Sequence, residues 1–232
     1  MDLRGWVRTS LLDYPEHIAT VLFTGGCNLR CPPCHNADLV LRPGELQAVP
    51  EEEVLEYLAR RAGLIDGVAI TGGEPALQSD LLPFLRRLHP LGLAVKLDTN
   101  GFFPEVLEAA LGEGLLAYVA MDIKAPPAKY ALLAGRPDLD LAPLERSIAL
   151  LRAATIPFEF RTTVVPGLLA TEDVVAIARW LQGAPRYALQ QFRPLRTLDP
   201  ALERAVPYSP DTLHAMVRAC AEWVEQVEVR GE

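Results

Sequence analysis

Short apolar runs alternate with longer stretches of helical spacing along this chain, and the alternation leaves few choices of fold. Six runs rich in apolar or β-branched residues predict strands at 19–23, 68–70, 94–97, 117–121, 158–165 and 187–190. Apolar residues at helical spacing predict helices at 50–61, 81–88, 104–111, 141–153, 171–181 and 210–224. Strands that alternate with helices predict an α/β fold built on a parallel sheet.

The number of these units favours one domain. About six β/α units follow one another without internal repeats, which suits a barrel or partial barrel better than two domains. The Pro-containing segments 125–127 and 136–138 are too short to separate two folding units. We therefore expect a single domain over residues 1–232, with the functional residues just after the carboxyl ends of the strands.

The overall composition excludes several classes of protein. Half of the residues are apolar and 22% are charged, which provides for a sizeable core in a soluble globular protein. The formal net charge of -8 argues against nucleic acid as a partner. The N-terminus lacks the charged-then-apolar order of a signal peptide, and the early apolar run at 18–23 is too short to span a bilayer. We expect a cytoplasmic protein with no membrane partner.

Three of the four cysteines crowd into one short segment after the first predicted strand. Cys27, Cys31 and Cys34 have the spacing C-x3-C-x2-C, and three thiolates in one loop can hold three corners of a 4Fe-4S cluster. The fourth iron would then have no protein ligand. The alternative is a structural zinc site with His35 as the fourth ligand, although such sites usually take two pairs of ligands from separate places. Cys220 stands alone in a predicted helix and reads as a packing residue.

The cysteine segment resembles the signature of the radical S-adenosylmethionine (SAM) superfamily. Within that superfamily, Cys34-His35-Asn36 is similar to the branch of glycyl-radical-enzyme activating enzymes. One departure is Pro33, since the family usually has an aromatic residue before the third cysteine. The resemblance implies a partial (β/α)6 barrel of the TIM type, a 4Fe-4S cluster, and SAM bound to the open iron. It also implies reductive cleavage of SAM to methionine and a 5'-deoxyadenosyl radical.

A paired-glycine motif follows the second predicted strand. In Thr71-Gly72-Gly73-Glu74-Pro75 the absence of two side chains lets the backbone approach a ligand closely, although an ordinary loop explains such a turn as well. The segment is similar to the GGE motif of the family. The resemblance implies that Gly72, Gly73 and Glu74 bind the amino group of SAM.

Two acids emerge after neighbouring strands, Asp98 after the third and Asp122 after the fourth. Carboxylates that face the inside of a barrel need a partner. Similar residues in pyruvate formate-lyase activating enzymes imply that Asp98, Thr99 and Asp122 hold a monovalent cation beside the SAM carboxylate. The same resemblance implies that Lys124 acts at the methionyl end, whereas a solvated lysine remains the plain alternative. Gln191, after the last predicted strand, would lie near the adenosine, although the family's histidine in that loop is missing.

The start of the chain, with Asp13-Tyr14-Pro15, resembles the activating proteins of anaerobic ribonucleoside-triphosphate reductase. This resemblance implies that the radical removes a hydrogen from a glycine Cα of a partner enzyme, an anaerobic ribonucleotide reductase. It also implies an electron donor of the flavodoxin or ferredoxin type. Two alternatives stay open. One is a radical SAM enzyme for a small molecule, such as a 7-carboxy-7-deazaguanine synthase, and the other is a non-catalytic, zinc-stabilised interaction domain.

Overall fold

A computed structural model gives the structure of this protein and describes residues 1–231. It contains one sheet of eight strands whose spatial order is the order of the sequence. The strands are β1 (Leu3–Ser10), β2 (Ala19–Thr24), β3 (Gly67–Gly72), β4 (Ala94–Thr99), β5 (Tyr118–Asp122), β6 (Phe158–Val164), β7 (Arg186–Gln191) and β8 (Gln226–Arg230). The β1 strand runs antiparallel to β2, and all the later neighbours are parallel.

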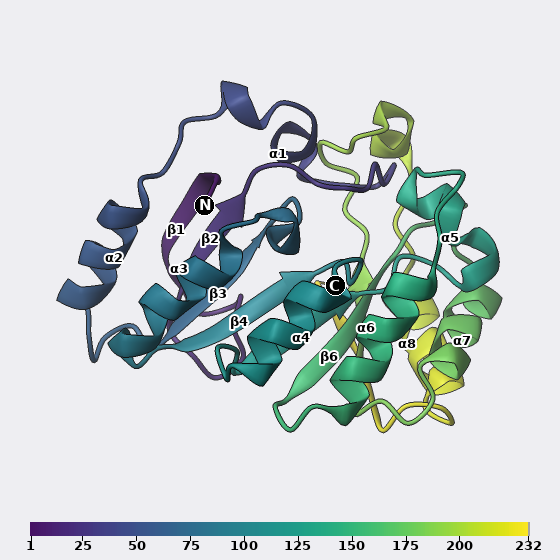
Figure 1. Cartoon of the computed structure of the whole chain (residues 1–232). Helices are drawn as coiled ribbons and strands as arrows, with labels where there is room; N and C mark the ends of the chain where they lie inside the picture. Colours follow the sequence, from purple (N-terminus) through teal and green to yellow (C-terminus); the bar gives the residue numbers. More distant parts are fainter. Residues whose placement is uncertain (232) are drawn as a thin grey trace.

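Helices connect the parallel strands and cover the outer face of the curved sheet (Figure 1). They are α1 (Ala37–Leu41), α2 (Glu51–Arg60), α3 (Leu81–Leu88), α4 (Pro104–Gly112), α5 (Pro127–Ala134), α6 (Ala142–Ala153), α7 (Thr171–Trp180) and α8 (Pro210–Cys220). Short 3-10 turns are η1 (Pro43–Glu45), η2 (Pro75–Leu77), η3 (His89–Leu91) and η4 (Pro200–Arg204). Within the described residues β1 and β8 remain the two edges of the sheet, so the barrel is partial, which confirms the predicted fold class.

All six predicted strands are present, and the predicted helices are present with small shifts at their ends. The helix predicted over 210–224 ends earlier, at Cys220, because the chain turns there to enter the edge strand β8. The sequence interpretation missed β1, β8, α1 and α5. Within residues 1–231 no helix is long and apolar enough to cross a membrane.

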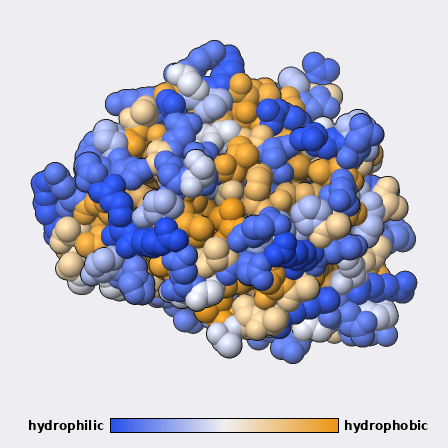
Figure 2. All heavy atoms as spheres, viewed as in Figure 1, coloured by the Kyte–Doolittle hydropathy of each residue, from blue (hydrophilic) through white to orange (hydrophobic). Residues whose placement is uncertain are grey.

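The core lies between the sheet and its helices. Helix α3 shows why these segments are helical, since its buried residues recur three and four positions apart, at Leu81, Phe84, Leu85 and Leu88. Burying each such side chain stabilises the fold by about 1.5–3 kcal/mol. Figure 2 shows the surface of the molecule, where hydrophilic residues predominate along the outline of this face and are interspersed with apolar residues toward its middle.

The inner side of the barrel contains a buried ion pair that joins three strands. The side chain of Glu159 on β6 is 1% exposed, and both of its carboxylate oxygens accept hydrogen bonds from Arg230 of β8, at 2.7 and 2.6 Å. The hydroxyl of Tyr118 on β5 donates to the same carboxylate at 2.9 Å. This contact secures the last strand to the rest of the sheet.

Candidate active site

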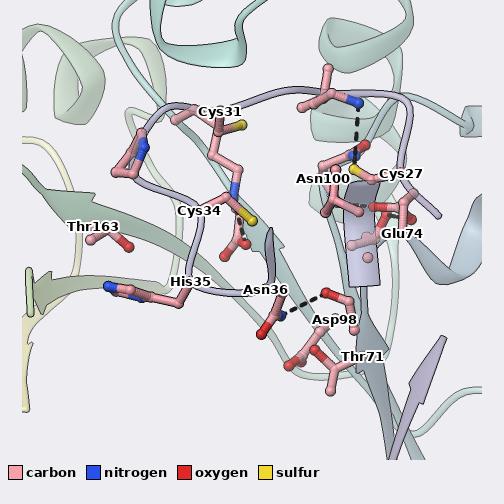
Figure 3. Close-up of a pocket in the computed structure, with 18 of the residues that line it drawn as sticks. Cys27, Cys31, Cys34, His35, Asn36, Thr71, Glu74, Asp98, Asn100 and Thr163 are labelled. Carbon is pink, nitrogen blue, oxygen red and sulfur yellow. Dashed lines mark hydrogen bonds and ion pairs between the residues drawn. The ribbon is translucent and has the colours of Figure 1, made fainter. Parts of the chain in front are cut away.

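The three clustered cysteines lie on the loop that follows β2. Their sulfur atoms point inward from the curve of this loop (Figure 3). They line a cavity of about 250 Å³. The other walls come from the carboxyl ends of five parallel strands or the loops after them, with Thr71, Gly72, Gly73, Glu74, Asp98, Thr99, Asn100, Asp122, Lys124, Arg161, Thr163 and Gln190. Parallel strands place their carboxyl ends at one edge, which is why residues so far apart in sequence meet here.

The paired glycines fasten the end of β3 to the start of the cysteine loop. The N–H of Gly73 donates to the carbonyl of Thr24 at 2.9 Å, and the N–H of Glu74 donates to the carbonyl of Gly26 at 2.8 Å. Gly72 has a φ of 120°, which only glycine adopts without strain. The glycines therefore allow close contact between the end of β3 and the start of the cysteine loop, in addition to any approach of a ligand.

Glu74 joins this segment to the loop after β4. One carboxylate oxygen accepts hydrogen bonds from the N–H of Ala76 at 2.9 Å and the hydroxyl of Thr99 at 2.8 Å, and the other accepts from the N–H of Asn100 at 2.7 Å. Burial raises the pKa of Glu74 to about 7, although these three donors oppose the shift. A carboxylate has about four acceptor positions, so roughly one remains for a ligand.

Asn100 links the same loop to Cys27. Its amide nitrogen lies 2.7 Å from the side-chain oxygen of Asn28 and 3.7 Å from the sulfur of Cys27, which also accepts from the N–H of Leu29 at 3.4 Å. Burial raises the pKa of Cys27 to about 12 and that of Cys31 to about 11. Burial thus favours the neutral form of the Cys27 and Cys31 thiols, and a bound metal centre would have to supply the positive charge that stabilises their thiolates.

Two flanking segments hold the cysteine loop from outside. After α5, Arg136 donates to the carbonyl of Asn28 at 2.8 Å, and the carbonyl of Ala134 accepts from the N–H of Arg30 at 2.9 Å. On the other flank, Leu198 and Asp199 donate their N–H groups to the carbonyls of Cys34 and Pro32 at 3.0 and 2.9 Å. These bonds fix the loop backbone although the loop has no regular secondary structure.

His35 is engaged away from the cysteine sulfurs. Its Nε2 lies 2.6 Å from the carbonyl oxygen of Arg193, and its ring stacks on Phe192 with 5.7 Å between the ring centroids. In the part of the chain that is described, no three His, Cys, Asp or Glu side chains converge closely enough to hold one metal ion. The arrangement does not resemble a closed Cys3His zinc site. Three inward thiols without a fourth partner suit a cluster, which spaces its ligands further apart than a single ion does.

A row of alternating charges lies at one wall of the cavity, which Asp98, Asp122, Lys124 and Arg161 line. Arg161 lies between the two acids, with its Nη1 3.3 Å from Asp98 and its Nε 2.9 Å from Asp122. Lys96 pairs with Asp98, and Lys124 pairs with Asp122 at 2.9 Å. Burial alone would raise the pKa of Asp122, but Arg161 and Lys124 together hold it well below its usual value. The row carries one more positive than negative charge.

The structure brings nearly all of the sequence-predicted site residues to this cavity, and Gln191 is the exception. Among the described residues Gln190 lines the cavity, whereas the side chain of Gln191 turns away and donates to the carbonyl of Tyr208 at 3.0 Å. Neighbouring residues of a strand face opposite sides, so the difference is a shift of one position. The prediction also omitted Arg161 and Thr163 of β6, although their inward alternation along that strand was a usable signal.

The comparisons with known proteins agree with this geometry. Residues 21–181 match the family model described as the radical SAM superfamily. A protein of Methanocaldococcus jannaschii, provisionally named as a glycyl-radical enzyme activating enzyme, is 31% identical over 97% of this chain and 94% of its own length. The 7-carboxy-7-deazaguanine synthase of Hyperthermus butylicus is 46% identical, but over only 34% of this chain and 33% of its own.

A solved structure supports the fold. The crystal structure of Streptococcus suis SuiB bound to the precursor peptide SuiA matches with a TM-score of 0.67 at 16% identity, over 91% of this chain and 48% of SuiB. This chain therefore spans about half the length of SuiB. Because the family model covers more than half of the chain and includes all three clustered cysteines, the chain belongs to the radical SAM superfamily.

Proposed function

We propose that this radical SAM enzyme holds a 4Fe-4S cluster on Cys27, Cys31 and Cys34 and activates a glycyl-radical enzyme, with an anaerobic ribonucleotide reductase as its partner. The observation that carries the proposal is that three inward thiols share one cavity with the strand-end residues of β3, β4 and β5. Cys27, Cys31 and Cys34 would hold the cluster, which, once reduced by an electron donor, would supply the one electron that cleaves SAM to methionine and a 5'-deoxyadenosyl radical. That radical takes a hydrogen atom from a glycine Cα of the partner and leaves 5'-deoxyadenosine.

The protein residues would position SAM around this chemistry. Gly72 and Gly73 bring backbone close to the cavity, and the remaining acceptor position of Glu74 suits an ammonium group such as the amino group of SAM. Lys124 contributes a positive charge at the cavity wall beside Asp122. SAM bound in the cavity would displace water from these walls, and this would strengthen each of these electrostatic contacts.

A protein substrate is favoured by the extent of the similarity. The relative named for glycyl-radical enzyme activation aligns over 97% of this chain, whereas the deazaguanine synthase aligns over 34%. The match to the deazaguanine synthase covers about a third of each chain, and so short a similarity does not indicate a shared substrate. The small-molecule reading remains the competing outcome of the experiment below.

Charge around the cysteine loop supports an acidic electron donor of the flavodoxin or ferredoxin type. The loop and the segments that flank it expose five arginines, namely Arg30, Arg136, Arg193, Arg196 and Arg204. The same segments contain four acids, Asp138, Asp140, Asp199 and Glu203, so they carry one more positive than negative charge, whereas the whole chain carries a net charge of -8. Leu195 and Val206 are 67% and 81% exposed beside these arginines. A basic surface with exposed apolar residues suits an acidic protein that must approach the cluster.

The donor proposal is tested by comparing two reductants. Arg204→Glu should slow SAM cleavage driven by an acidic flavodoxin at low salt, and it should leave cleavage driven by dithionite unchanged. Arg60→Glu, on the exposed face of α2, is the matched control. Equal rates for both variants with flavodoxin would contradict the docking surface without touching the catalytic proposal.

The catalytic proposal is tested after anaerobic reconstitution. Iron and sulfide should reach about four each per chain, and the reduced protein should convert SAM to 5'-deoxyadenosine and methionine. Cys27→Ala, Cys31→Ala and Cys34→Ala should each abolish cleavage, whereas Cys220→Ala should retain it, because Cys220 is buried in α8 away from the cavity. One bound zinc and no cleavage would overturn the assignment.

Partner choice requires a separate measurement. The reduced enzyme, SAM and the anaerobic ribonucleotide reductase of the same cell should yield a glycyl radical by electron paramagnetic resonance. Cleavage of SAM with no radical in any glycyl-radical enzyme of that cell would favour a small-molecule substrate instead.

A further inference from the structure

Every carboxylate oxygen of Asp98 and Asp122 already faces a positively charged nitrogen. The two oxygens of Asp98 pair with Lys96 and, at 3.3 Å, with Nη1 of Arg161. The two oxygens of Asp122 pair with Nε of Arg161 at 2.9 Å and with Lys124 at 2.9 Å. The side chain of Arg161 is only 12% exposed, so its guanidinium is a fixed part of the cavity wall.

The hydroxyl of Thr99 is engaged as well. It donates to Glu74 at 2.8 Å and accepts from the N–H of Gly101 at 3.1 Å. Asp98, Thr99 and Asp122 are the three residues that the resemblance to activating enzymes assigned to a monovalent cation. Each carboxylate oxygen of the two aspartates already faces a cationic nitrogen of the protein, and the Thr99 hydroxyl is hydrogen-bonded, so a further cation would add positive charge where the negative charge is already balanced.

We propose that the Arg161 guanidinium replaces the monovalent cation, so that this enzyme binds SAM without an alkali metal ion. The inference rests on the proposed function in one respect, namely that SAM binds in this cavity. Arginine suits the role because it stays charged at any relevant pH and its planar fork can pair with two carboxylates at once. An ion entering from solvent would have to displace this buried group and leave its charge without a partner.

The charge balance of the row supports the replacement. Lys96, Arg161 and Lys124 supply three positive charges against the two carboxylates. The surplus positive charge lies at a cavity wall formed by Arg161 and Lys124, where an anionic ligand group can approach. Adding an alkali ion would raise this surplus further and gain nothing for the aspartates. Arg161 is therefore a positioning residue that keeps the two strand ends at a fixed separation.

The first test uses the unaltered, cluster-reconstituted protein. SAM affinity is measured by anaerobic calorimetry in potassium, sodium and tetramethylammonium chloride at equal ionic strength. We expect the three dissociation constants to agree within about twofold, which is under 0.5 kcal/mol. Affinity about tenfold weaker in tetramethylammonium would overturn the proposal, because it would reveal a required alkali ion.

The second test removes the guanidinium. Arg161→Met should weaken SAM binding about tenfold in tetramethylammonium, and potassium or added methylguanidinium should restore part of it. Arg161→Lys, which keeps a positive charge, should lose less affinity for SAM than Arg161→Met. The substitution Arg60→Met, at an exposed arginine, serves as the control. A loss in Arg161→Met that no cation relieves would contradict the proposal, since a purely structural role predicts that pattern. If Arg161→Met does not fold, Arg161→Lys and the unaltered protein still decide the question.

These readouts are separable from the proposed function. Formation of 5'-deoxyadenosine in any of the three salts tests the radical chemistry, whereas the dependence of binding on the salt tests the role of Arg161. Cleavage of SAM only in the presence of potassium would support the radical chemistry and contradict the proposed role of Arg161.

Discussion

Gly73 lies directly against Gly26, since a β-carbon on Gly73 would stand 1.9 Å from the carbonyl oxygen of Gly26. That oxygen also accepts the N–H of Glu74 at 2.8 Å. The contact joins the end of β3 to the loop that carries the cysteines, and the atom in the way is backbone, which cannot rotate aside. The spacing between the two strand ends therefore depends on a missing side chain.

Gly73→Ala should force these two segments apart. We expect a loss of about 2 kcal/mol or more in the free energy of unfolding, because overpacking against backbone has no inexpensive relaxation. Iron bound after reconstitution should fall with it, since Cys27 follows Gly26 directly. Thermal unfolding of the cluster-free protein and iron analysis measure the two effects.

Gly112→Ala is the matched control for that substitution. Gly112 ends α4, and a β-carbon there meets nothing within 4 Å. Its replacement should leave iron content unchanged and should stabilise slightly through the higher helix propensity of alanine. Equal iron content in both variants would show that the Gly73 contact does not control the loop.

Glu74→Gln should destabilise the protein although the two side chains have nearly the same shape. One oxygen of the Glu74 carboxylate accepts from the N–H of Ala76 and the hydroxyl of Thr99, and the other oxygen accepts from the N–H of Asn100. Either orientation of a glutamine amide would therefore turn its NH2 group toward a backbone N–H. A buried donor that faces a donor costs about 1–3 kcal/mol. Chemical denaturation at pH 8 measures this cost, and the exposed Glu225→Gln should show none. A Glu74→Gln protein as stable as the parent would mean that this network adds nothing.

Stability should also depend on pH through Glu74. Its pKa rises from 4.5 to about 7 on folding, so the folded state binds more protons than the unfolded state between these values. The resulting stabilisation is fully present below pH 4.5 and is lost as the pH rises through about 7, by on the order of 3 kcal/mol. Denaturation of the cluster-free protein across this range should show the decline, and Glu74→Gln should lack it. Parallel pH profiles for the two proteins would contradict the shift.

The sequence predicted the parts of the fold that repeat and missed those that occur once. The strands β2, β3 and β5 carry short apolar runs that are almost wholly buried, and this pattern is typical of a strand covered on both faces. The edge strands lack this pattern: β1 contains Arg4, Gly5 and Arg8, and β8 alternates polar and apolar residues over only five positions. The sequence interpretation missed helix α5 because it begins at Pro127, directly after Pro126, and this proline pair was interpreted as part of a loop.

The site divides in a similar way. Motifs with their own composition, namely the cysteine segment and Gly72-Gly73-Glu74, were located from the sequence because each lies directly after a predicted strand. The contacts made by Arg161 and Asn100 were not, since their partners Asp122 and Asn28 lie 39 and 72 residues away in the sequence. The alternation along β6 could have shown that Arg161 faces inward, but tertiary packing decides which side chains it meets.

Arg230→Met tests the buried ion pair that secures β8. The change would leave the Glu159 side chain, which is 1% exposed, with the hydroxyl of Tyr118 as its remaining side-chain donor. We expect a loss of about 3 kcal/mol in the free energy of unfolding, at the low end for a buried pair, because Arg230 itself is 34% exposed. The double variant Glu159→Gln with Arg230→Met should recover much of this loss, since a neutral amide can still accept from Tyr118 without an unpaired charge. Urea denaturation of the parent, both single variants and the double variant completes the cycle, and additive losses would show that the two residues do not act as a pair.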